Sequence, residues 1–208
     1  MSCIIEDNAV VLFQGDSITD WGRDYNNASS LGNGYVMIID ALFSAVCPEK
    51  KVTFINRGIS GNRVKDLQER WKKDCLDLNP SWVSILIGIN DCGINYTSEE
   101  DFENSYRDIL VQTKTKTKAG IIIMEPFVLP VSDYRNKWRE DLNPKINIIR
   151  KLAREFATYY IPLDGIFAQA SVIRELDFWS SDGVHLTQAG NALVAKAWLN
   201  TVGINITV

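Results

Sequence analysis

Short apolar runs and longer amphipathic segments alternate along the chain. Strands are predicted at residues 10–15, 51–56, 82–87, 120–125 and 161–163. The first run is nearly continuous in apolar residues, which is typical of a parallel strand buried on both faces rather than of a strand with one wet face. It ends at Gly15, and the third run is likewise followed by a glycine, Gly88.

The segments between these runs carry apolar residues every three or four positions, which is the spacing of an amphipathic helix. Helices are predicted at residues 35–46, 64–78, 142–160 and 164–175, with two more beginning at Ser98 and after Thr187. Pro48 and Pro80 end the first two, because proline cannot continue a helix. Loops are predicted at residues 20–34 and 126–139.

Strands that alternate with helices predict a parallel sheet covered on both faces. We therefore expect an α/β fold: a three-layer α/β/α sandwich with a five-stranded parallel sheet in the flavodoxin-like order 2-1-3-4-5. The chain has 208 residues and shows no internal repeat or linker, so a single domain over residues 1–208 is predicted.

Composition narrows the function classes. The formal net charge is −4 and no basic run is present, which argues against nucleic acid as a partner. No apolar segment is long enough to predict a membrane span. The first eight residues contain no basic residue, so no signal peptide is predicted. The four cysteines occur singly, which favours reduced thiols in a cytoplasmic protein over a metal or redox site. The oligomeric state stays open, a homo-oligomer included.

Four short polar clusters stand out, three of them where predicted strands end. They are Gly15–Ser17, Asn56–Asn62, Gly88–Asp91 and Asp182–His185. Because the carboxyl ends of parallel strands share one edge of a sheet, the first three should converge where α/β proteins bind ligands. The fourth cluster precedes the last helix and holds the only histidine of the chain.

These residue types suit acyl transfer. The Ser17 hydroxyl is a weak nucleophile until a base takes its proton, and His185 is suited to that role near neutral pH. Asp182, three residues earlier, can orient the imidazole through its other nitrogen. The backbone N–H groups of Ser17 and Gly61 and the side-chain amide of Asn90 are the candidate donors of an oxyanion hole. This chemistry requires no cofactor.

The clusters resemble the four blocks of the SGNH (GDSL-type) hydrolase superfamily. Ser17, Gly61, Asn90 and His185 occur in the order of that family's signature residues. The resemblance implies that Ser17 is the nucleophile, that Ser17, Gly61 and Asn90 form the oxyanion hole, and that His185 and Asp182 are the base and its orienting acid. Two departures from the family pattern lie beside these residues: Ile18 replaces a leucine, and Leu186 stands where proline is frequent.

A closer resemblance is to intracellular bacterial acetyl-xylan esterases. It covers residues 15–20, 31–36, 56–62 and 82–91. It implies a serine esterase whose partner is a small-molecule ester, such as an acetylated xylo-oligosaccharide, with neither nucleic acid nor membrane involved. Two alternative functions remain: a lysophospholipase or thioesterase for longer acyl chains, and a non-catalytic carbohydrate- or nucleotide-binding module. The second lacks support from a G-x-G-x-x-G or Walker A loop.

Each residue assignment also has a structural alternative. Ser17 could cap a helix, Asp182 could cap its own turn, and Asn90 could satisfy turn backbone. Ser60 is a rival serine, although it is not in a G-x-S-x-G elbow. Gly61 could be an ordinary turn glycine.

Several other residues could serve either the site or the fold. Asp16 and Asp91 are expected to hold loop backbone rather than a metal ion. Tryptophan and arginine side chains beside the clusters could line a sugar site or pack within loops: Trp21, Arg63 and Trp179. Two further tryptophans are predicted core residues, Trp71 and Trp198.

Overall fold

The computed structural model describes residues 3–206, so the first two residues of the N-terminal segment considered above lie outside it. Its centre is a sheet of five parallel strands in the order β2-β1-β3-β4-β5. The strands are β1 (Val10–Gly15), β2 (Thr53–Asn56), β3 (Trp82–Leu86), β4 (Gly120–Met124) and β5 (Tyr159–Ile161). The predicted strand order 2-1-3-4-5 is confirmed.

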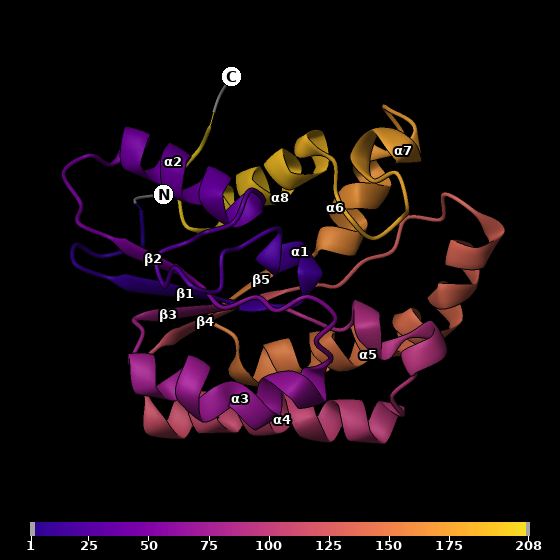
Figure 1. The fold of residues 1–208 in the computed structure, drawn as a ribbon, viewed down its shortest axis with the longest axis horizontal. Coiled ribbons are helices and arrows are strands. Elements are labelled where there is room, and N and C mark those ends of the chain that lie inside the picture. Colours follow the sequence, from indigo (N-terminus) through magenta and orange to yellow (C-terminus); the bar gives the residue numbers. More distant parts are fainter. Residues whose placement is uncertain (1–2, 207–208) are drawn as a thin grey trace.

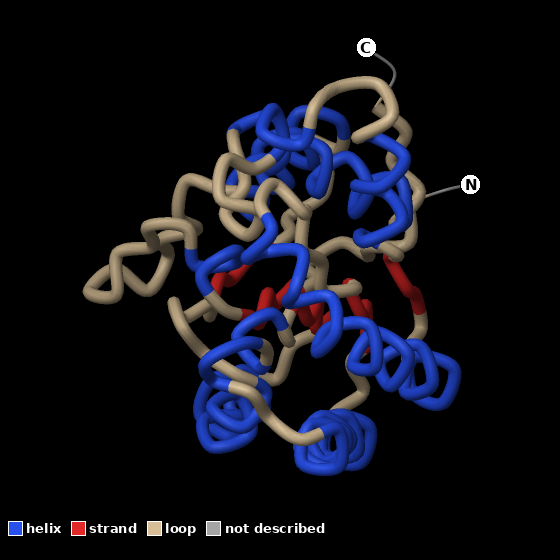
Figure 2. The backbone as a smooth tube through the Cα atoms, turned by 90° about the vertical axis from the view of Figure 1, so that its right-hand side faces the viewer, coloured by secondary structure: helices blue, strands red, loops and turns tan. Residues whose placement is uncertain are grey.

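Helices cover both faces of this sheet and make three layers (Figure 1). One face carries α2 (Tyr35–Val46), α6 (Leu163–Ala170) and α8 (Gln188–Thr201). The other carries α3 (Val64–Asp74), α4 (Glu99–Lys116) and α5 (Asp133–Phe156). Short helical turns complete the described chain: α1 (Ser17–Asp20), α7 (Leu176–Trp179), η1 (Leu76–Leu78), η2 (Ile89–Asp91) and η3 (Gly93–Asn95). Figure 2 shows the strands between the two groups of helices.

The apolar core is divided by the sheet into two clusters. Successive side chains of a strand point to opposite faces, so Phe13 packs with Trp198 in the cluster under α2 and α8. Its neighbour Leu12 belongs with Trp71 to the cluster under α3 and α4. Trp71 and Trp198 are both fully buried, as predicted from their helical spacing.

The longest helix begins earlier than the sequence predicted. Residues 126–139 were expected to be a loop, but α5 begins at Asp133 and runs through Pro144. Ser132 explains the start, because its side chain accepts a hydrogen bond from the Arg135 N–H and so caps the helix. Of the predicted loop at residues 126–139, only residues 126–132 lie outside a helix or strand.

Other boundaries also differ. The helix predicted at 142–160 ends at Phe156, because Tyr159 and Tyr160 belong to β5. The helix predicted at 64–78 ends at Asp74, and a separate 3-10 turn follows it. The fifth strand is Tyr159–Ile161 rather than 161–163, because Pro162 has no N–H for a strand ladder. The helix predicted at 164–175 spans only Leu163–Ala170, and α7 begins separately at Leu176.

The fold places the predicted clusters at one edge of the sheet. Ser17 follows the end of β1 by two residues, Arg57 directly follows β2, and Gly88 follows the end of β3 by two residues. The Arg57 N–H donates to the Phe13 carbonyl at 2.9 Å, and the Ile59 N–H donates to the Gly15 carbonyl at 3.1 Å. Pairing between β1 and β2 thus continues past the strands into the loops. Among the described helices, none is long and apolar enough to cross a membrane.

Candidate active site

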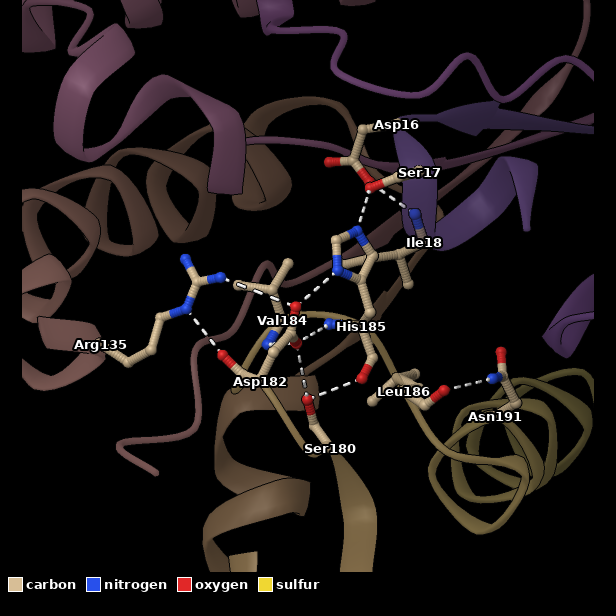
Figure 3. Close-up of polar contacts among 10 residues, drawn as sticks. All are labelled: Asp16, Ser17, Ile18, Arg135, Ser180, Asp182, Val184, His185, Leu186 and Asn191. Carbon is tan, nitrogen blue, oxygen red and sulfur yellow. Dashed lines mark hydrogen bonds and ion pairs between the residues drawn. The ribbon is translucent and has the colours of Figure 1, made fainter. Parts of the chain in front are cut away.

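Ser17, His185 and Asp182 form a chain of contacts at this edge (Figure 3). The Ser17 Oγ lies 3.0 Å from His185 Nε2, although 168 positions separate the two residues in the chain. The His185 Nδ1 lies 2.7 Å from Asp182 Oδ2. The imidazole therefore lies within hydrogen-bonding distance of the hydroxyl on one side and of the carboxylate on the other.

Ser17 owes its position to a short helix rather than to a cap. It is the first residue of α1, and Asp16 is the N-cap, whose Oδ1 accepts the Ile18 N–H at 3.0 Å. The capping alternative for Ser17 is therefore wrong. The strand ends at Gly15, where an added Cβ would lie 2.4 Å from the Leu86 carbonyl oxygen. Glycine allows the chain to turn beside β3 and present the serine at the sheet edge.

The turn that carries His185 is organised by the Asp182 carboxylate. Its Oδ1 accepts the N–H groups of Val184 at 2.9 Å and His185 at 2.7 Å. Gly183, between Asp182 and Val184, has a φ of +84°, a conformation that favours glycine. Asp182 therefore caps its turn with one oxygen and contacts the imidazole with the other.

Hydrogen bonding keeps Asp182 ionised. Burial alone would raise the pKa of this carboxyl, but hydrogen bonds from the His185 ring and from the Val184 and His185 N–H groups lower the pKa to about 2. An ionised carboxylate only accepts hydrogen bonds, so His185 Nδ1 must carry the hydrogen. The Nε2 atom is then left to accept the Ser17 O–H.

A cavity of about 370 Å³ opens beside these residues. It is lined by Ser17, Trp21, Gly22, Asn33, Ser60 and His185. The Trp21 ring lies 5.8 Å from the His185 ring, centroid to centroid. A hollow of about 970 Å³ lies at the opposite edge of the sheet and is lined by residues such as Trp82 and Gly120, which begin their strands. The smaller cavity is the one that contains the serine and the histidine.

Of the side chains predicted to face a sugar, only Trp21 lines this cavity. Arg63 is the N-cap of α3 and pairs with Asp66 at 3.5 Å. Trp179 packs edge-on against Phe178 and against the core under α8. Both therefore serve local packing at the positions where the structure places them.

Gly61 and Asn90 lie in adjoining loops. Gly61 has a φ of +82°, and an added Cβ would have no atom within 4 Å. The positive φ therefore explains why glycine is favoured at this position, since no neighbouring atom crowds it. The Asn90 Nδ2 donates to the Asn62 carbonyl at 3.0 Å, which leaves its second hydrogen free of that bond.

Two buried polar residues, whose roles the sequence did not reveal, tie these loops to α1. Asn56 is fully buried, and its Nδ2 donates to the Thr19 carbonyl at 2.7 Å and to the Leu31 carbonyl at 2.8 Å. Asp20 accepts the N–H of Ser60 at 3.0 Å and its hydroxyl at 2.6 Å. The Ser60 hydroxyl is thus bonded to a carboxylate, which leaves Ser17 as the serine paired with histidine. Both sets of hydrogen bonds join residues that are far apart in the chain, so the neighbouring sequence does not predict them.

A third buried polar residue fixes the helix that follows His185. Asn191 of α8 accepts the Tyr35 N–H at 2.9 Å, in place of a cap that Gly34 cannot supply to α2. Its Nδ2 donates to the Leu186 carbonyl at 3.3 Å and to the Thr187 carbonyl at 3.0 Å. The chain just after the histidine is therefore fastened to the start of α2.

Asp16 and Asp91 hold loop backbone, as predicted. Asp91 accepts the Val64 N–H at 3.1 Å and the Thr97 hydroxyl at 2.8 Å. Burial raises the pKa of Asp91 to about 6 and that of Asp16 to about 7. Within residues 3–206, no group of three or more His, Cys, Asp or Glu residues has the geometry of a metal site.

The cysteines are free thiols in the described chain. Cys92, beside the Asn90 loop, is almost fully buried, and burial raises its pKa to about 12. A thiol that stays protonated is a poor nucleophile and a poor metal ligand. Cys92 therefore packs near the site without the chemical character to act in it.

Comparison with known proteins agrees with this geometry. The sequence model of the GDSL-like lipase/acylhydrolase family matches residues 13–193. An acetylxylan esterase from Geobacillus stearothermophilus is 32% identical in an alignment 206 residues long that covers 93% of each chain. The crystal structure of that organism's acetylxylan esterase Axe2 covers 97% of both chains with a TM-score of 0.86 and 32% identity.

Other solved structures are similar over nearly the whole chain. Two are described as catalytic mutants of Axe2, one with alanine for a histidine and one with alanine for a serine. A further Axe2 variant is described as an acetyl-xylooligosaccharide esterase; it has a TM-score of 0.88 and 31% identity, and covers 98% of this chain and 99% of that chain. LAE5, an alpha/beta hydrolase enzyme from the Lake Arreo metagenome, has a TM-score of 0.90 at 25% identity and covers 99% of this chain and 100% of that chain.

The burial of Asp16 predicts a particular dependence of stability on pH. Because its folded pKa is raised from 3.8 to about 7, the folded protein holds a proton that the unfolded chain releases. The free energy of unfolding should therefore fall as pH rises across that window, by about 1.4 kcal/mol per pH unit at most. Asp16→Asn removes this titration, so the stability of the wild type relative to the variant should decline over the same window.

Urea unfolding at several pH values between about 4 and 8 measures this difference. Glu49→Gln, at an exposed carboxyl, is the matched control and should follow the wild type. Parallel pH curves for the wild type and Asp16→Asn would contradict the assignment.

Proposed function

The chain belongs to the GDSL-like lipase/acylhydrolase family of carboxylic ester hydrolases, and we propose that it is a serine esterase that removes acetyl groups from carbohydrate esters through an acyl-enzyme on Ser17. The observation that carries this proposal is the contact chain from the Ser17 Oγ to His185 at 3.0 Å and from His185 to Asp182 at 2.7 Å. The catalytic mutants of the relative Axe2 replace one serine and one histidine, the same two residue types.

The first half of the reaction forms the acyl-enzyme. The Ser17 Oγ attacks the ester carbonyl carbon while its proton moves to His185 Nε2. The Asp182 carboxylate stays ionised and stabilises the imidazolium that forms. The tetrahedral intermediate then collapses: the carbon–oxygen bond to the alcohol breaks, and the leaving alcohol takes the proton from His185.

The second half releases the acid. His185 removes a proton from a water molecule, whose oxygen attacks the acyl carbon on Ser17. When this second tetrahedral intermediate collapses, the Ser17 oxygen leaves and recovers the proton from the imidazolium. Acetate is released, and the serine, the histidine and the carboxylate return to their starting forms.

The oxyanion of each intermediate needs donors already in place. We assign the Ser17 N–H, the Gly61 N–H and the Asn90 side-chain amide to this role. The bond from Asn90 Nδ2 to the Asn62 carbonyl supports the assignment, because it fixes the amide between two of the loops. Losing one such donor typically costs about 2.7–4 kcal/mol of transition-state stabilisation.

Two observations support a small acyl group and a sugar alcohol. The relative with 32% identity is named an acetylxylan esterase, and the Axe2 variant an acetyl-xylooligosaccharide esterase. The cavity beside Ser17 is also lined mainly by small or polar residues, with one indole. Polar side chains suit hydroxyl groups and an indole suits the apolar face of a sugar ring, whereas a long acyl chain needs an apolar channel.

Replacing the serine tests the reaction type. Ser17→Ala should lose nearly all hydrolysis of p-nitrophenyl acetate and all labelling by a fluorophosphonate probe, because both require its hydroxyl. Ser60→Ala is the matched control; it should still react with the probe, because Ser60 Oγ contacts Asp20 rather than histidine. Wild-type turnover in Ser17→Ala, or an unlabelled wild type, would refute the proposal.

A series of esters with acyl chains from acetyl to decanoyl tests the acyl preference. Because polar groups dominate the cavity lining, kcat/KM should be highest for acetyl and should fall as the chain lengthens. Acetylated and fully deacetylated xylo-oligosaccharides, compared by acetate release, extend the test to sugars. A maximum at octanoyl or decanoyl would favour the lysophospholipase or thioesterase alternative instead.

A further inference from the structure

A positively charged side chain from outside the four clusters contacts the Asp182–His185 turn. Arg135 lies in the first turn of α5, and its Nε donates a hydrogen bond of 2.7 Å to the Asp182 carbonyl oxygen. Its Nη2 lies 3.7 Å from Asp182 Oδ2, the carboxylate oxygen that also contacts His185 Nδ1. Figure 3 shows the guanidinium group beside Asp182 with both contacts. One planar group thus contacts the backbone and the carboxylate of the same residue.

The guanidinium is held in place by its own helix. The Arg135 side chain is only 17% exposed, and its guanidinium carbon lies 4.3 Å from the centre of the Trp138 ring. Trp138 packs against Gly93, where an added Cβ would lie 2.9 Å from the indole. The Gly93 N–H donates to Asp141 at 2.8 Å. Arg135, Trp138 and Asp141 are three positions apart, so one face of α5 contacts both the histidine turn and the loop after Asn90.

The segment before α5 adds a second attachment to the same turn. The Leu129 N–H donates to the Gly183 carbonyl at 2.9 Å. A Cβ on Gly183 would lie 2.4 Å from the Leu129 carbonyl oxygen and 3.1 Å from Arg135 Cγ. The turn therefore sits directly on residues 129–135, with no room for a side chain between them.

We propose that Arg135 is a positioning residue for the esterase reaction, holding Asp182 where its carboxylate can direct His185 at Ser17. The proposal rests on the function proposed above for this site. A planar guanidinium with several donors fixes direction better than a point charge does. Direction matters here because a displacement of catalytic groups by about 1 Å can cost about a hundredfold in rate.

The test compares Arg135→Gln with Arg139→Gln in the full chain, using p-nitrophenyl acetate. Arg139 is the matched control, because it lies on the same helix but pairs with Asp164 at 2.8 Å. Arg135→Gln should lower kcat about tenfold with KM within about twofold of the wild type, because positioning acts on the chemical step. Arg139→Gln should match the wild type in both kcat and KM.

A wild-type kcat in Arg135→Gln, or a loss of activity carried by KM instead of kcat, would overturn the proposal. If that variant fails to fold, Arg135→Lys provides the test instead. It keeps the aliphatic side chain and the positive charge but loses the planar guanidinium group. Its kcat should fall severalfold with KM within about twofold of the wild type, and a wild-type kcat would overturn the proposal. A wild-type protein that hydrolyses no ester would instead count against the proposed function, so the two failures are distinguishable.

Discussion

The site depends on the parallel direction of β2, β1 and β3. In a parallel sheet the carboxyl ends of neighbouring strands lie at one edge. Here the segment after β2 carries Gly61, the segment after β1 carries Ser17 and the segment after β3 carries Asn90. The histidine comes from far along the chain, yet it reaches the same edge because α8 packs against α2 on one face of the sheet. An antiparallel pairing of any of these strands would move its loop to the opposite edge.

Buried polar side chains then join the loops to one another. Asn56 holds the loop after β2 against α1, Asp91 holds the loop after β3 against α3, and Asn191 holds the segment after His185 against α2. Each is almost fully shielded from water and satisfied by hydrogen bonds to backbone. A buried amide or carboxylate that loses its partner is costly, so such contacts specify one arrangement of the loops rather than several. Asp16 is the exception, because its Oδ2 has no hydrogen-bond partner among the described residues.

Much of this arrangement could be predicted from the sequence. Apolar runs marked the strands, two of them with a glycine at the end, and the alternation with helices led to the sheet order. The four clusters led to Ser17, Asp182 and His185, which the structure brings into contact. The residues that could not be predicted act across long sequence separations: nothing near Asn56 or Asn191 indicates which backbone groups their amides will meet. Arg135 was missed for a different reason, because two prolines made residues 126–139 look like a loop, whereas Ser132 starts a helix there.

The central claim is that the hydroxyl of Ser17 becomes acylated while His185 and Asp182 act with it as one unit. The most direct measurement is mass spectrometry of the peptide that carries Ser17, after the enzyme has been mixed with an acetyl ester and quenched in acid during turnover. The account predicts an acetyl group on Ser17 that appears with the first turnover and disappears once the ester is exhausted. Continued hydrolysis with no acetyl group on that peptide, or with the group on another residue, would contradict it.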